Sequence, residues 1–253
     1  MTALSVNLNK LALLRNSRGR NYPDLLDFAR RFIALGVAGL TIHPRPDERH
    51  IKRRDAYALA ELLQDHPAVE FNIEGYPSPE FLALIADVRP TQCTLVPDTD
   101  DQLTSDHGWD CVAQAAFLTP VLERLQELQV RSALFLDPEP AQAEAAARLG
   151  SQRIELYTEA YAAAYHGPHK QAELERYRAT AQRAQALGLG VNAGHDLDLV
   201  NLGDFLALGG ILEVSIGHAL TVECIEFGME TVIAHYLALC RTASTTGLYS
   251  APP

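Results

Sequence analysis

Gly39-Leu40-Thr41-Ile42-His43-Pro44-Arg45-Pro46 begins as an apolar run of the strand type and ends in two prolines. His43 therefore stands where a predicted strand ends and a loop begins. In a barrel of parallel strands, the side chains at such strand ends carry the chemistry. Arg45, Arg49 and His50 place anion-binding groups beside this imidazole. The plainer interpretation is a core strand followed by a basic surface loop.

Short runs rich in Val, Ile, Leu and Phe, typical of parallel strands covered on both sides, recur along the chain. The predicted strands are 4–8, 39–43, 69–74, 92–96, 131–136, 153–157, 190–193 and 212–216. Amphipathic helical patterns follow them, at 23–35, 54–63, 79–88, 112–128, 140–149, 169–187, 197–208 and 222–240. This alternation in 253 residues predicts an α/β protein with a (β/α)8 TIM barrel. An open doubly wound sheet is the alternative, although no Gly-rich dinucleotide turn follows the first strand.

The length of 253 residues fits one (β/α)8 barrel or two small domains, and we expect a single barrel domain that spans residues 1–241. The hydrophobic fraction of 47% suffices for a large core. Residues 242–253 are small, polar and end in proline, so a disordered tail is expected there. The four cysteines form no C-x-x-C pair, which favours reduced thiols. With no leader pattern and no apolar run of membrane-spanning length, we expect a soluble, cytoplasmic protein without a membrane partner.

The charge of this chain is unevenly distributed. The net charge is −11, which argues against nucleic acid as a partner. Residues 10–54, however, hold eleven Lys or Arg against four acids, a charge of +7, and the remainder carries −18. A basic zone in an acidic protein suits small anions such as phosphates. Solvated helix faces are the plainer interpretation, and they account for part of this zone.

Polar or titratable residues stand at nearly every predicted strand end. They include Asn7, Asn9 and Lys10; His43 and Arg45; Asn72 and Glu74; Thr104 and Ser105 in the loop after strand four; Asp137; Glu155 and Glu159; His195; Ser215 and His218. Carboxyl ends of parallel strands meet at one mouth of a barrel. This clustering favours an enzyme over a binding module.

Two imidazoles and a carboxylate, His43, His195 and Glu74, are predicted to converge in that mouth. Such groups exchange protons near neutral pH. Gly194-His195 and Gly217-His218 end strands seven and eight, where barrels often bind phosphate through backbone N–H groups. Hydrogen-bonded structural histidines and tight turns are the plainer interpretations.

Four further features are ambiguous. The basic stretch 15–20 offers guanidinium groups for phosphate or carboxylate, or forms a solvated loop. The pair in His166-Gly167-Pro168-His169 has metal-like spacing but is interpreted as a loop, so no metal site is predicted. Glu155 points inward, either as a supporting group or as the partner of a buried Arg. Trp109 and Cys111 are interpreted as packing residues.

Together these motifs resemble the pyridoxine 5′-phosphate synthase family. The matching segments run in order from Val6 to His218: Val6-Asn7, Leu14-Arg15-Asn16 with Arg18-Gly19, Tyr22-Pro23-Asp24, Thr41-Ile42-His43 with Arg45, Arg49-His50-Ile51, Asn72-Ile73-Glu74, Leu95-Val96-Pro97, Val191-Asn192-Ala193-Gly194-His195 and Ile216-Gly217-His218-Ala219. The resemblance implies a barrel with a few extra helices that assembles into homo-oligomers, with an octamer expected. It implies condensation of 1-deoxy-D-xylulose 5-phosphate with 3-amino-2-oxopropyl phosphate to pyridoxine 5′-phosphate, inorganic phosphate and water. No cofactor is implied.

The resemblance also implies residue roles. His43 and Glu74 would accept protons, and His195 would donate one. The residues expected to contact substrate are Arg45, His50 and Thr104 for the deoxyxylulose phosphate, and Asn7, Arg18, Gly217 and His218 for the aminoketone phosphate.

The chain departs from the family pattern at three strand ends. Asn9-Lys10 replaces Asp-His after strand one, and both residues are retained as substrate-contact candidates. Asp196 replaces the Gly after His195, and only its backbone N–H is expected to keep a phosphate contact. Tyr157-Thr158-Glu159 replaces His-Thr-Gly. Another phosphosugar isomerase or aldolase, and a non-catalytic barrel that binds a phosphorylated metabolite, are the alternative functions.

Overall fold

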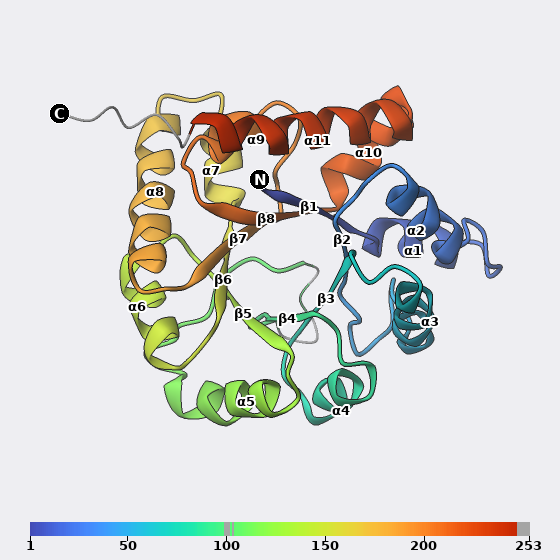
Figure 1. Cartoon of the computed structure of the whole chain (residues 1–253), viewed down its shortest axis with the longest axis horizontal. Coiled ribbons are helices and arrows are strands. Elements are labelled where there is room, and N and C mark those ends of the chain that lie inside the picture. Colours follow the sequence, from blue (N-terminus) through green and yellow to red (C-terminus); the bar gives the residue numbers. More distant parts are fainter. Residues whose placement is uncertain (99–101, 103, 247–253) are drawn as a thin grey trace.

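The computed structural model describes residues 1–98, 102 and 104–246, with the backbone alone for 243–246. Eight parallel strands close into a barrel in sequence order, so that β8 pairs with β1 (Figure 1). The strands are β1 (Ala3–Asn7), β2 (Gly39–Ile42), β3 (Glu70–Gly75), β4 (Gln92–Leu95), β5 (Arg131–Leu136), β6 (Arg153–Tyr157), β7 (Gly190–Gly194) and β8 (Ile211–Ile216). The predicted TIM barrel is confirmed.

Helices surround this barrel on its outside (Figure 1). They are α1 (Asn9–Asn16), α2 (Leu25–Ala34), α3 (Arg53–Gln64), α4 (Pro79–Val88), α5 (Ala115–Glu127), α6 (Pro140–Arg148), α7 (Glu159–Ala164), α8 (Lys170–Ala186), α9 (Leu202–Leu206), α10 (His218–Phe227) and α11 (Met229–Thr246). None of them, within the described ranges, has the length and apolar content needed to cross a bilayer.

The helices differ from the prediction in four places, and one of them is the predicted helix 197–208, of which only α9 is helical. α1 and α7 were not predicted, because eight and six residues carry too few turns for a clear periodicity. The predicted helix 222–240 is two helices, α10 and α11, which meet at Gly228 with φ +84°. This left-handed backbone favours glycine and ends α10. α11 then continues to Thr246, past the predicted domain end at residue 241, while 247–253 lie outside the described residues and their disorder stays a prediction.

Outward-facing strand residues pack the barrel against its helices. Leu40, Ile42 and Ile73 have no exposed surface and belong to one continuous core. Burying each such side chain contributes about 1.5–3 kcal/mol relative to its exposure. Trp109 and Cys111 are buried in the same core, as predicted. The apolar positions thus fix which side of each strand faces outward.

The alternate strand positions face the barrel axis and are polar. Ser5 and Thr41 hydrogen-bond across β1 and β2 at 2.7 Å. Thr94 donates a hydrogen bond to Asn72 or to Glu155, whose acceptor oxygens lie 3.1 and 3.2 Å away. Since strand side chains alternate between two faces, an inward Thr41 and Asn72 also turn positions 43 and 74 toward the axis. The two residues then stand at the barrel mouth.

Candidate active site

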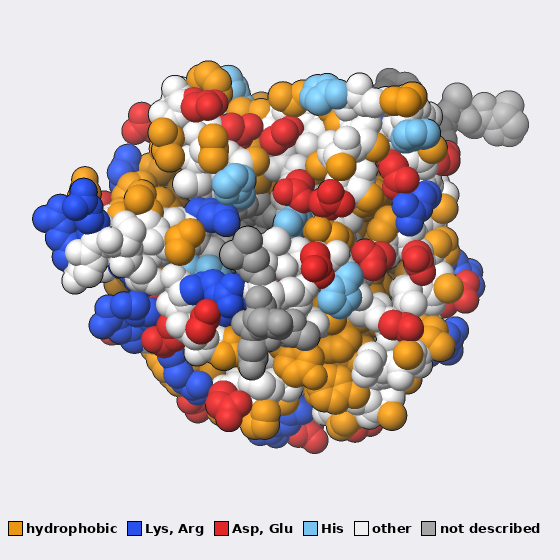
Figure 2. All heavy atoms as spheres, turned by 180° about the vertical axis from the view of Figure 1, so that it is seen from behind, with side chains coloured by type: hydrophobic (Ala, Val, Ile, Leu, Met, Phe, Trp, Pro, Cys, Tyr) orange, Lys and Arg blue, Asp and Glu red, His pale blue; other side chains and the backbone are white. Residues whose placement is uncertain are grey.

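A cavity of about 800 Å³ opens at the carboxyl ends of the strands. Figure 2 shows this face of the molecule, with a central hollow. Twelve of the thirteen residues predicted for the site line the cavity: Asn7, Asn9, Lys10, His43, Arg45, His50, Glu74, Thr104, His195, Asp196, Gly217 and His218. Arg18 is the exception, because it lies exposed in the turn after α1. Thus side chains from far apart in the sequence meet in one cavity.

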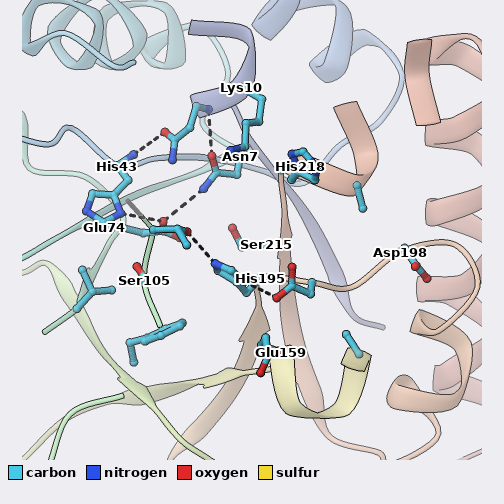
Figure 3. A pocket seen from close by; sticks show the side chains of 18 of the residues that line it. Asn7, Lys10, His43, Glu74, Ser105, Glu159, His195, Asp198, Ser215 and His218 are labelled. Atoms are coloured by element: carbon cyan, nitrogen blue, oxygen red, sulfur yellow. Dashed lines mark hydrogen bonds and ion pairs between the residues drawn. The ribbon is translucent and has the colours of Figure 1, made fainter. Parts of the chain in front are cut away.

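His43 and Glu74 lie side by side at the mouth (Figure 3). His43 Nδ1 is 3.8 Å from Glu74 Oε2, and the two residues are only 6% and 9% exposed. Asn7 Nδ2 donates to the same Glu74 oxygen at 3.3 Å. The imidazole and the carboxyl group can therefore act on one bound molecule from the same wall.

Asn9 positions the strand end that carries His43. Its side-chain oxygen accepts a hydrogen bond from the His43 backbone N–H at 2.9 Å. The side-chain oxygen of Asn7 accepts in turn from the Asn9 backbone N–H at 3.0 Å. These bonds link the ends of β1 and β2, so the oxygen atoms of both amides are engaged by protein.

The environment of His43 favours its neutral form. Burial lowers its pKa well below the ordinary value, and the nearby Arg45 guanidinium lowers it further. Burial lowers the pKa of His50 to about 4, with further contributions from Arg45, Arg49 and Lys10. A neutral His43 has a lone pair free to accept a proton at neutral pH.

Burial raises the pKa values of the carboxyl groups in the barrel, whereas it lowers those of the two histidines. Burial raises the pKa of Glu74 well above its ordinary value, and the neighbouring Glu155 raises it further. Burial also raises the pKa of Glu155 to about 8 and that of Glu213 to about 7. Glu213 has a cationic neighbour, Arg153, at 3.3 Å. The barrel axis therefore holds carboxyl groups that exchange protons near neutral pH.

Glu155→Gln should flatten the pH dependence of stability. In the unfolded chain this carboxyl ionises near its ordinary pKa of 4.5, whereas in the folded barrel it keeps its proton up to about pH 8. Folding takes up a proton in this interval, so wild-type stability falls as pH rises through it. The neutral glutamine removes this loss, on the order of 1–3 kcal/mol. Thermal unfolding at several pH values between about 5 and 8 should show the Tm of the variant rising relative to wild type. A difference that stays constant with pH contradicts the assignment.

His195 reaches the cavity because the chain leaves the strand geometry at its position. Continued alternation after β7 would turn it away from the axis, but its φ of +85° redirects the chain. A Cβ on the preceding Gly194 would lie 2.2 Å from Glu155 Oε1, so glycine leaves room for that carboxyl group. The ring of His195 is hydrogen-bonded on both nitrogens, with Nε2 3.0 Å from Thr104 Oγ1 and Nδ1 2.6 Å from Asp196 Oδ2.

The cavity has a basic wall and an acidic wall. Lys10, Arg45, Arg49 and His50 line the side of β1 and β2, and the acids Glu159, Asp196 and Asp198 line the side of β6 and β7. Figure 2 shows basic and acidic side chains on opposite sides of the hollow. The basic wall suits a phosphate group.

Arg45 is a buried part of that basic wall. Its guanidinium is paired with Asp98 and also donates to the Gln102 carbonyl at 3.2 Å. Ser105 Oγ donates to Asp98 Oδ2 at 2.8 Å. Sequence reasoning missed Asp98, because its pairing with a residue 53 positions away has no local signal. Arg45 thus holds the start of the β4–α5 loop beside the cavity.

Gly217 and His218 line the cavity after β8, where α10 begins, next to the end of β1. Backbone N–H groups at a helix N-terminus attract anions. A Cβ at Gly217 would lie 3.0 Å from Asn7 Cβ, so glycine permits the close approach of β1. The start of α10 therefore offers a second place for an anion, apart from Arg45.

The stretch 15–20 differs from the expected anion-binding loop. Arg15 belongs to α1 and is buried, and both of its terminal nitrogens bond the Asp55 carboxylate at 2.8 Å. Asn16 donates to the His50 carbonyl at 2.7 Å. These residues therefore hold the β2–α3 loop rather than a ligand.

Two other predictions concern possible metal or ion partners. The stretch 166–169 is a turn between α7 and α8, as predicted. Within the described part of the chain, no group of three His, Cys, Asp or Glu side chains could hold a metal ion. Glu155 accepts from Thr94 and is not ion-paired with an arginine among the bonds of the described residues.

Comparison with known proteins identifies the family. The model of the family described as pyridoxal phosphate biosynthesis protein PdxJ matches residues 4–242. The chain belongs to the PdxJ family. Two relatives are both named pyridoxine 5′-phosphate synthase. The one from Cytophaga hutchinsonii is 48% identical, covering 94% of this chain and 98% of the relative. The one from Xanthomonas campestris pv. campestris is 49% identical, covering 97% of this chain and 98% of the relative.

Solved structures share the barrel fold with this PdxJ chain. The 3-hexulose-6-phosphate synthase from Salmonella typhimurium matches with a TM-score of 0.65 and 12% identity, covering 96% of this chain and 100% of that chain. Phosphoribosyl anthranilate isomerase from Thermus thermophilus matches with a TM-score of 0.59 and 18% identity, covering 94% and 100%. At such identities the likeness concerns the fold alone. The PdxJ assignment, unlike the fold, separates this chain from the isomerase and aldolase alternatives.

Proposed function

We propose that this protein is a pyridoxine 5′-phosphate synthase, which condenses 1-deoxy-D-xylulose 5-phosphate with 3-amino-2-oxopropyl phosphate. The products are pyridoxine 5′-phosphate, inorganic phosphate and water. One observation carries the proposal: in a PdxJ chain, His43, Glu74 and His195 face one cavity that anion-binding groups from two parts of the chain also line. The atoms of the reaction balance without an oxidant or reductant, so proton transfer and orientation supply the catalysis.

His43 and Glu74 are the proposed proton acceptors. The lowered pKa of His43 keeps its imidazole neutral, and burial that raises the pKa of Glu74 makes its ionised form a stronger base. The two groups lie on one wall, 3.8 Å apart. They can therefore remove protons in successive steps, during imine formation and ring closure.

His195 is the proposed proton donor on the other side of the cavity. Its Nε2 atom points toward the His43 and Glu74 side, where Thr104 accepts or donates at 3.0 Å (Figure 3). An acid opposite two bases lets one substrate lose a proton while a departing oxygen gains one. The loss of water and of phosphate from the sugar both need such a donor.

The two phosphates are proposed to occupy two separate places in the cavity. Arg45, His50 and Thr104 would contact the deoxyxylulose phosphate, in exchange for part of the Arg45–Asp98 pairing. Gly217 and His218, with Asn7, would contact the aminoketone phosphate at the start of α10. Lys10 and the amide nitrogen of Asn9 are proposed to contact substrate between them. Arg18 keeps a proposed phosphate role only if its exposed turn closes over the cavity.

The proposed course begins when the amine of one substrate attacks the ketone of the other and loses water to give an imine. Phosphate is then eliminated from the sugar, one water adds, and an aldol-type closure followed by the loss of two further waters makes the aromatic ring, so that the whole course releases two waters in net. Each step moves a proton to or from carbon, nitrogen or oxygen. A cavity that orients both substrates supplies much of the rate.

The proposed reaction is tested by mixing purified protein with both phosphorylated ketones and following pyridoxine 5′-phosphate and released phosphate together. We expect equal amounts of the two products. Omission of either ketone should abolish both signals. The absence of product at every pH between about 6 and 9 would refute the proposal.

The family resemblance also suggests a homo-octamer, which we adopt as a proposal. Apolar side chains on α1 and α10 are exposed, and these helices pack together. They include Leu13, Leu14, Val222, Ile225 and Phe227, of which Ile225 is 76% exposed. Such a patch favours contact with a second copy.

That the protein works in the cytoplasm also stays a prediction.

Ile225→Glu combined with Phe227→Glu should lower the oligomer size, because burying two carboxylates in an apolar interface is unfavourable. Light scattering coupled to gel filtration should give a mass near eight chains of 27.7 kDa for wild type and a smaller species for the variant. Leu212→Glu, an exposed position near the start of β8 and away from α1 and α10, serves as the control for added charge. A wild-type mass of one chain would contradict the proposal.

A further inference from the structure

His195 is held by the two residues that replace the family pattern at strands six and seven. Its ring and that of Tyr157 form a T-shaped pair, with centroids 5.0 Å apart and planes at 82°. Its Nδ1 atom is 2.6 Å from Asp196 Oδ2. Since both replacements touch the same imidazole, they belong to one local arrangement around the proposed proton donor.

The Asp196 carboxylate defines which ring nitrogen carries a proton. A carboxylate only accepts hydrogen bonds, so the 2.6 Å contact requires a proton on Nδ1. The His195 bond lowers the pKa of Asp196, as expected for an ionised carboxylate bound to a donor. The other nitrogen, Nε2, then faces the cavity beside Thr104 (Figure 3).

The substrate contact expected for Asp196 is less consistent with this geometry. A side-chain carboxylate repels a phosphate, and here it is turned to His195. The strained φ of +85° at His195 also needs compensation by its surroundings. The hydrogen bonds on both ring nitrogens and the ring contact with Tyr157 offset the backbone strain at His195.

Resting on the proposed synthase function, we propose that Asp196 is a positioning residue that orients His195 and stabilises its protonated form. The imidazolium releases its Nε2 proton to the departing oxygen of the substrate and keeps its Nδ1 proton on Asp196. The neutral ring then takes a proton from solvent at Nε2, which restores the donor. Asp196 stays ionised throughout and touches no substrate atom.

Other titratable groups surround this pair and contribute to its charge balance. They are Tyr157 and Glu155 from β6, Glu159 from α7, His218 from α10 and Asp106 from the loop after β4. Asp196, by comparison with these groups, is hydrogen-bonded directly to the imidazole of His195. An opposite charge in contact has the largest effect on a protonated ring. Removal of the Asp196 charge should therefore change the pH dependence of kcat more than removal of any of the other charges would.

Two substitutions separate orientation from charge. Asp196→Asn keeps an oxygen that can accept from Nδ1–H but loses the negative charge, and Asp196→Ala loses both. Asp204→Asn is the control for a lost charge, because Asp204 lies in α9 outside the cavity lining and pairs with Lys170 instead of contacting His195. Thermal unfolding should establish that all three variants are folded.

The first measurement is ¹⁵N NMR of the histidine rings, with the His195 signals assigned by their loss in His195→Gln. We expect the neutral ring of wild type and Asp196→Asn to carry its proton on Nδ1, and Asp196→Ala to lose this preference. A wild-type ring protonated on Nε2 would overturn the proposal. This readout does not depend on enzymatic activity, so it stands even if no pyridoxine 5′-phosphate is formed and the synthase function fails.

The second measurement is kcat against pH with both phosphorylated ketones. Because a donor must be protonated, kcat declines at high pH, and this decline should start about one pH unit lower in Asp196→Asn and Asp196→Ala. Asp204→Asn should follow wild type, and KM for the aminoketone phosphate should change less than about twofold in all variants. An unmoved decline, or a raised KM in its place, would mean that Asp196 acts on substrate or structure and would overturn the proposal.

Discussion

Turnover should fall at least ~100-fold in His43→Ala and in Glu74→Gln, because each change removes a proton-transfer group from the cavity. Both side chains are buried at the mouth and lie 3.8 Å apart, so water cannot readily take the place of either. The glutamine keeps the shape of Glu74 and can still accept from Asn7. Its effect should therefore report on the lost proton exchange, with KM values near those of wild type.

The double variant and two surface controls sharpen this expectation. His169→Ala and Glu80→Gln remove an exposed imidazole and an exposed carboxylate outside the cavity and should leave kcat unchanged. If His43 and Glu74 act as a unit, the double variant should lose little more than either single variant. Near-normal turnover in both single variants would refute their assigned roles.

Arg45→Ala should raise KM for deoxyxylulose phosphate by about 10- to 100-fold, which corresponds to the loss of a charge-assisted hydrogen bond. The KM for the aminoketone phosphate should change much less, since that phosphate is assigned to the start of α10. The variant also leaves Asp98 without its guanidinium partner, and a buried carboxylate without a partner repels a nearby phosphate. Steady-state kinetics with each substrate varied in turn measures both KM values.

Two variants control for that second effect. Arg45→Ala with Asp98→Asn removes the unpaired charge, so any KM increase that remains belongs to the lost phosphate contact. Arg53→Ala removes a cation from the same basic zone outside the cavity and should behave as wild type. An unchanged KM for deoxyxylulose phosphate in Arg45→Ala would contradict the assignment.

The strands and the mouth residues were predictable because both follow from local patterns. Short runs rich in Val, Ile, Leu and Phe mark the buried strands, and strand alternation turns His43 and Glu74 toward the axis. Polar residues at consecutive strand ends meet in any closed parallel barrel. Twelve of the thirteen predicted site residues therefore line one cavity. Their roles in binding and catalysis stay predictions.

Contacts between distant residues were not predictable from such patterns. Arg15 is held by Asp55, 40 residues later, and Arg45 by Asp98, 53 residues later. Either arginine would have served as an anion ligand by its type alone. The role of Asp196 depends on the φ of +85° at His195, which brings the two side chains together and has no signature in a Gly-His-Asp sequence.

The central claim is that one cavity holds the forming ring between His43 and Glu74 on one wall and His195 on the other. A crystal structure with pyridoxine 5′-phosphate and inorganic phosphate tests it most directly. We predict the pyridine ring between these walls, one phosphate group at Gly217 and His218, and the other near Arg45. A ring bound outside this cavity, or one touching neither His43 nor His195, would contradict the account.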